Sequence, residues 1–149
     1  MKRFLRVSIL VFALILVTGC GSKGKTLTCT TKRKTGEEKY YYTYKAVFNK
    51  KDELKKFYVT TKVKADRRSD LKDLKEDFDD EAEDELEDID GITYKSKISD
   101  GYLIINATVD MSKIDEDDFE DIFDIEADID YDDLKDYYED NDYEDFTCK

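Results

Sequence analysis

The fold is decided by residues 92–110, which read ITYKSKISDGYLIINATVD. Ser99-Asp100-Gly101 is typical of a tight turn, and both flanking runs are rich in β-branched and aromatic residues. By the two-residue period of a strand, one face of the second run is apolar: Leu103, Ile105, Ala107 and Val109. We therefore predict an antiparallel hairpin, with strands over 92–98 and 102–110, that buries one face.

The residues before this hairpin predict an amphipathic helix from about Asp70 to Glu87. Apolar residues recur there every three or four positions among charged ones: Leu71, Leu74, Phe78, Ala82, Leu86 and Ile89. We expect Ser69 to be the N-cap and Gly91 to end the helix in a left-handed conformation. A stripe of this kind needs a sheet to cover it.

Three earlier strands are predicted over residues 26–31, 40–48 and 54–63, joined by turns at 32–37 and 49–53. In the middle strand, alternation places one set of residues on one face: Tyr40, Tyr42, Tyr44, Ala46 and Phe48. We expect that face to pack under the helix. Tyr41 and Val47, on the other face, are then the candidate contacts for a protein partner.

The C-terminal part returns to a helical pattern. A short acidic helix is expected from Ser112 to Phe123, and Asp130 is expected to cap a second one from Tyr131 to about Asp140. Residues 146–148 are expected to form a short edge segment. The prediction is therefore a single α+β domain over 26–149, with an antiparallel sheet of five to six strands, a central amphipathic helix on one face and short acidic C-terminal helices.

The start of the chain predicts export and lipid anchoring. Three basic residues precede the apolar run 7–17, which spans only about half of a ~30 Å bilayer core and so is typical of a signal peptide, residues 1–19. It ends in Val17-Thr18-Gly19-Cys20, which resembles the bacterial lipobox. We expect acyl chains such as palmitate on Cys20, residues 20–25 as a lipidated flexible tether, and a domain held at the cell membrane on its extracytoplasmic side. The alternative is an ordinary signal peptide with an incidental cysteine.

Two further cysteines, Cys29 and Cys148, remain after lipidation of Cys20. In an exported domain an even pair favours a disulfide, which here closes a loop of more than 100 residues. Two separate buried thiols are the alternative. A catalytic thiol is a remote third reading, since the chain has no His to activate it.

Charge is distributed unevenly along the chain. Residues 20–65 carry 13 basic and 4 acidic side chains, residues 66–90 carry 4 and 14, and residues 110–149 carry 3 and 19. The basic part can lie against anionic lipid or wall polymer, or it can pack beside the acidic helices of its own domain. The acidic balance disfavours nucleic-acid binding.

No catalytic constellation stands out, so we expect neither an enzyme nor a cofactor. The chain lacks His, the commonest general base and metal ligand. Five acids match positions 1, 3, 5, 9 and 12 of an EF-hand loop: Asp128, Asp130, Asp132, Asp136 and Glu139. Asp133 occupies the position of the required Gly, so we expect no metal site, with weak, diffuse cation binding as the alternative.

Three segments, Asp90–Lys95, Asp100-Gly101 and Thr108–Asp115, resemble the YehR-like family of small bacterial lipoproteins. The resemblance implies an α+β fold with a curved antiparallel sheet and implies no activity. The dense acidic runs and the Cys29/Cys148 pair depart from the family pattern. Together these observations predict a membrane-anchored lipoprotein with a small acidic extracytoplasmic domain, a non-catalytic binding or accessory module for a protein or cell-wall partner. The alternatives are a surface-coating structural lipoprotein or a weak cation-binding protein.

Overall fold

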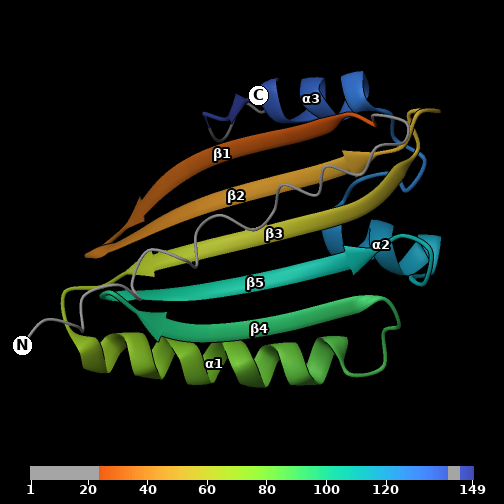
Figure 1. The fold of residues 1–149 in the computed structure, drawn as a ribbon. Coiled ribbons are helices and arrows are strands. Elements are labelled where there is room, and N and C mark those ends of the chain that lie inside the picture. Colours follow the sequence, from red (N-terminus) through yellow and green to blue (C-terminus); the bar gives the residue numbers. More distant parts are fainter. Residues whose placement is uncertain (1–23, 141–144) are drawn as a thin grey trace, which may run out of the picture.

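The computed structural model describes residues 24–140 and 145–149, and it has an α+β fold built on one antiparallel sheet (Figure 1). The six strands lie in the order β4-β5-β3-β2-β1-β6. Their bounds are β1 Thr26–Thr35, β2 Glu38–Phe48, β3 Leu54–Lys64, β4 Ile92–Ser99, β5 Tyr102–Asp110 and β6 Thr147–Cys148. The helices are α1 Arg68–Leu86, α2 Glu116–Phe123 and α3 Tyr131–Glu139. The predicted signal peptide and the lipidation site at Cys20 lie outside the described residues.

The predicted hairpin is present as β4 and β5. Ser99 pairs with Tyr102, and the two residues between them have positive φ, 53° at Asp100 and 78° at Gly101. Two successive left-handed residues are what a tight hairpin turn requires. The hairpin then joins the rest of the sheet where β5 pairs with β3.

The first strand is longer than predicted, because the expected turn at 32–37 is largely strand. β1 continues to Thr35, and residues 31–35 pair with residues 38–42 of β2. Only Gly36 and Glu37 turn the chain, with φ +62° at Gly36. Pairing with a long neighbour thus overrides the weak strand pattern of a basic run.

The central helix lies within two residues of its predicted bounds, but both predicted capping residues were wrong. Arg67 is the N-cap, in an extended conformation, and Ser69 lies inside the first turn. At the other end Glu87 still has right-handed backbone angles. Gly91, with φ +88°, instead turns the chain into β4 beside the backbone of Ile114. Gly91 is therefore required for the entry into β4 and for the close approach of the Ile114 backbone, and not for the end of the helix.

The three described helices pack on one face of the sheet, and two core clusters lie between them and the strands. One cluster joins Phe119 of α2 and Leu134 of α3 to the half of the sheet where β1 begins. The other joins Leu71 of α1 to the opposite half through Val63, Leu103 and Ile105. Figure 1 shows α1 running along β4 and α3 along β1. None of the helices in the described ranges is long and apolar enough to cross a bilayer.

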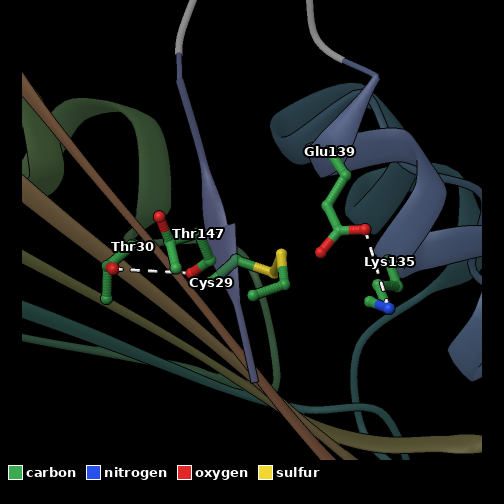
Figure 2. Close-up of a disulfide and its surroundings, with 6 residues drawn as sticks. Cys29, Thr30, Lys135, Glu139 and Thr147 are labelled. Atoms are coloured by element: carbon green, nitrogen blue, oxygen red, sulfur yellow. Dashed lines mark hydrogen bonds and ion pairs between the residues drawn. A yellow bond between two sulfur atoms is a disulfide. The ribbon is translucent and has the colours of Figure 1, made fainter.

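Strand β6 is attached to β1 both covalently and by hydrogen bonds. Cys29 and Cys148, the pair that the cysteine count favoured, form a disulfide across the two strands (Figure 2). The backbones of Thr28 and Lys149 exchange two hydrogen bonds of 2.9 Å. The end of the chain is therefore fixed against β1, with Cys29 fully buried in the core.

Candidate functional site

The candidate site is the sheet face that carries no described helix, which we call the open face. Strand register assigns to it the even residues of β1 and β5, the even residues of β3 from Lys56 onward, the odd residues of β2 and β4, and Thr147. Its charged residues are one acid, Asp110, and nine lysines: Lys32, Lys34, Lys39, Lys45, Lys56, Lys62, Lys64, Lys95 and Lys97. Since α1, α2 and α3 are rich in Asp and Glu, the domain has a basic sheet side and an acidic helical side.

Residues of the open face form rows across the strands, because directly paired residues lie side by side. We call the row Lys32–Tyr41–Lys62–Ile104–Lys97 the alternating row. The row toward the β1–β2 turn has the paired residues Lys34–Lys39–Lys64, with the pair Tyr102–Ser99 beyond Lys64. The row on the other side, the hydroxyl row, is Thr30–Thr43–Thr60–Asn106–Lys95. Cations therefore gather at the end of the open face that is remote from Thr26.

A groove of about 690 Å³ runs across this part of the open face. The alternating row contributes Lys32, Tyr41, Lys62 and Ile104 to its lining, and the hydroxyl row contributes Thr30 and Thr43. Asp100, in the β4–β5 turn, and Asp145, beside β6, also line it. Because the lining residues come from all six strands of the sheet, the groove is shaped for an elongated ligand.

Aromatic rings form part of the groove. The rings of Tyr41 and Tyr102 meet edge to face with centroids 6.3 Å apart, although their strands are separated by β3. The ammonium group of Lys64 lies 5.9 Å from the centroid of Tyr102. Such contacts hold the rings in place and keep the lysine charge beside them.

The structure places both predicted contact residues, Tyr41 and Val47, on the open face. Tyr41 is 38% exposed and lines the groove, whereas Val47 is half-buried and lies opposite Thr26 and Lys56, outside the groove. The lysines of the open face were not singled out from the sequence. The signal that could have found them is their two-residue spacing, as in Lys32 and Lys34 or Lys62 and Lys64.

On the helical side, a polar cluster fastens α1 to β4. Asp79 of α1 accepts hydrogen bonds from Lys75 and from the Ser96 hydroxyl. Burial acts to raise the pKa of Asp79, but these hydrogen bonds outweigh it and the pKa lies below its usual value. Burial, together with the charge of Asp79, raises the pKa of Tyr94 to about 12. This arrangement keeps a charged carboxylate and a neutral phenol at the helix–sheet contact.

Two of the five acids that matched an EF-hand pattern, Asp130 and Glu139, make contacts at helix α3. The Asp130 side chain accepts hydrogen bonds from the backbone N–H groups of Asp132 and Asp133, at 2.9 and 3.0 Å, and so caps α3. Glu139 lies 3.6 Å from the ammonium group of Lys135 one turn away (Figure 2). Within residues 24–140 and 145–149, no three His, Cys, Asp or Glu side chains are grouped to hold a metal ion.

Comparison with known proteins gives one fold-level likeness. No protein-family model matches the chain, and no curated protein matches it. The NMR structure of the E. coli YehR protein is similar over 68% of this chain and 70% of that one, with 24% identity and a TM-score of 0.44.

Proposed function

We propose that this protein is a lipid-anchored, extracytoplasmic binding module that acts without catalysis and holds an anionic partner on its open face. The observation that carries the proposal is the separation of charge in the domain, with nine lysines on one side of the sheet and acidic helices on the other. An anion is attracted to the first side and repelled by the second, so the partner is directed to one face.

The distribution of ion pairs supports this proposal. The salt bridges of the described residues use Lys25, Lys55, Arg67, Lys75 and Lys135, and none of these belongs to the open face. Eight of the nine open-face lysines are exposed, the exception being half-buried Lys45. The positive charge of this face is thus available to a partner.

Anchoring in this proposal depends on the lipobox at residues 17–20. The tether between Cys20 and Thr26 has few residues and can extend by only ~20 Å, at about 3.3–3.6 Å per residue. A domain on so short a tether stays within reach of the cell envelope. Partners of the open face are therefore expected among the anionic molecules of that envelope.

The anchoring is tested by expressing the full chain in bacteria and fractionating the cells. We expect wild-type protein in the membrane fraction, with palmitate label on residue 20, and a Cys20→Ser variant that is unlabelled. Persistent labelling of Cys20→Ser, or unprocessed wild-type protein in the cytoplasm, would refute the anchor.

Binding is tested by crosslinking intact cells that express the wild type, Lys32→Gln/Lys62→Gln or Lys72→Gln/Lys113→Gln. The second pair is a matched control, because Lys72 and Lys113 are exposed but lie on α1 and in the loop after β5. We expect the first pair alone to lose crosslinked partners. Equal yields from all three proteins would favour a coating role, in which the acidic helices only provide charge and solubility.

A further inference from the structure

We infer that the groove on the open face binds a polymer of polyol units joined by phosphodiesters, lying across the strands along the alternating row. This inference rests on the proposed function and names the chemistry of the anionic partner. It rests on the charge type, the spacing and the neighbours of the groove residues.

The charge type of the open face is compatible with phosphate. Every cation of the open face is a lysine, and no arginine belongs to it. The lysine ammonium is a compact point charge that binds phosphate oxygens from many directions, and it does not require the bidentate geometry with which arginine binds carboxylates and phosphates alike. A phosphodiester, with one charge shared by two oxygens, suits such a surface.

The spacing favours alternating charged and uncharged units. Neighbouring strands lie about 4.8 Å apart, so Lys32 and Lys62 are about 10 Å apart with Tyr41 between them. Ile104 then separates Lys62 from Lys97 in the same way. A polymer ligand that lies across the strands therefore contacts cations that alternate with apolar side chains.

The flanking rows supply what each kind of unit needs. On one side the hydroxyl row offers Thr43, whose side chain can donate to and accept from the hydroxyl groups of a polyol, and Thr30, whose hydroxyl donates to the Thr147 carbonyl at 3.5 Å and can accept from a polyol. On the other side Lys34, Lys39 and Lys64 add charge. The Tyr41 ring supplies a flat apolar surface for the carbon skeleton.

The lysine rows also carry an unfavourable interaction that an anion would relieve. Lys39 lies directly opposite both Lys34 and Lys64, and like charges paired across strands destabilise a sheet. Two acids, Asp100 and Asp145, line the groove, but neither belongs to the alternating row or to the row of Lys34, Lys39 and Lys64. A bound polyanion places negative charge where the rows lack it.

The test measures binding of a glycerol phosphate oligomer to the full chain, reconstituted through its lipid anchor into phosphatidylcholine nanodiscs so that the anchor does not insert into added vesicles. Inorganic polyphosphate of equal charge, an uncharged dextran, a single-stranded oligodeoxynucleotide and vesicles containing phosphatidylglycerol are measured beside it. We expect the glycerol phosphate oligomer to bind at least tenfold more tightly than each of the others. A preference of that size requires both the charge and the polyol.

Variants locate the binding. Exposed charge contacts change affinity by a few-fold each, so Lys32→Gln/Lys62→Gln is expected to weaken binding about tenfold, and Lys72→Gln/Lys113→Gln less than twofold. The slope of log K against log salt should become shallower by about 1.4 in the first pair, at roughly 0.7 per lost phosphate contact. Tyr41→Ala should weaken binding of the glycerol phosphate oligomer but not of polyphosphate. Circular dichroism of each variant confirms that the fold is kept.

The outcomes separate this inference from the proposed function. If polyphosphate or the oligodeoxynucleotide binds as tightly as the glycerol phosphate oligomer, and Tyr41→Ala has no effect, the groove recognises charge alone and the inference of a polyol phosphate polymer is overturned. Tighter, lysine-dependent binding to the vesicles would replace the polymer with a lipid surface and leave the proposed function standing. If no anion binds in a way that depends on Lys32 and Lys62, both fail.

Discussion

Removal of the Cys29–Cys148 disulfide should lower the free energy of unfolding by about 5 kcal/mol. The two cysteines are separated by 119 residues, and the chain-entropy model assigns about 4.7 kcal/mol to a 100-residue loop and slightly more to a longer one. Because domains of this size unfold with only about 5–15 kcal/mol, the bond is expected to supply a third or more of the stability. Cys29→Ala/Cys148→Ala removes the bond while leaving only a small void at the buried Cys29.

The assay is urea unfolding of residues 24–149, followed by far-ultraviolet circular dichroism. Oxidised wild type, reduced wild type and the double variant are compared, and the variant with added reductant is the control for the reagent itself. Reduced wild type and the variant should agree within about 1 kcal/mol, both well below the oxidised protein. A loss of under 1 kcal/mol would refute the entropic reasoning, and two alkylatable thiols in the wild-type protein isolated from cells would refute the bond.

Three further changes test the scaffold. Asp79→Asn should destabilise the protein at neutral pH, and the difference in unfolding free energy from wild type should shrink as the pH falls below about 4. The pKa of Asp79 is lowered in the folded protein, so the ionised carboxylate stabilises the fold above the usual pKa of 3.8 and this stabilisation is lost as the carboxylate becomes protonated. A difference that is independent of pH in urea titrations would contradict the prediction. Gly91→Ala should cost about 3 kcal/mol or more in the urea unfolding assay, because φ is +88° and the new Cβ would lie 2.6 Å from the Ile114 backbone nitrogen. Gly36→Ala, with φ +62° and no atom within 4 Å, should cost about 1 kcal/mol in the same assay. Asp130→Ala should cost about 1 kcal/mol by removing the α3 cap, and an unchanged melting temperature would argue against that cap.

The elements that the sequence predicted well are those in which local pattern and tertiary packing agree. The sequence of the β4–β5 hairpin has turn residues that favour a left-handed conformation and an apolar residue at every second position of β5. The structure confirms both the turn and the buried face. The α1 stripe likewise predicts the contact of Leu71 with the sheet. Where pattern and packing disagree, packing decides. Lys32–Thr35 lacks apolar residues, yet it forms strand because β2 lies beside it.

The candidate site was harder to predict, for a physical reason. A lysine on an exposed strand face and a lysine on a helix surface look the same in the sequence. Lys32, Lys62 and Lys97 become neighbours only when register aligns β1, β3 and β4 through the strands between them. Tyr41 was accessible to prediction because its position follows from alternation within one strand. The basic composition of residues 20–65 indicated a cationic surface but could not locate it.

The two-residue strand β6 protects one edge of the sheet against aggregation. An exposed strand edge can template pairing with a second chain and start aggregation, and charged side chains are one defence. Along the outer edge of β1, residues 26–31 carry no charge, while Lys32, Arg33 and Lys34 follow. β6 covers the uncharged segment at Cys29 and Thr30, and the covalent link keeps it there when the edge opens transiently. Strand β6 thus covers the uncharged part of the β1 edge, where pairing with a second molecule would otherwise begin.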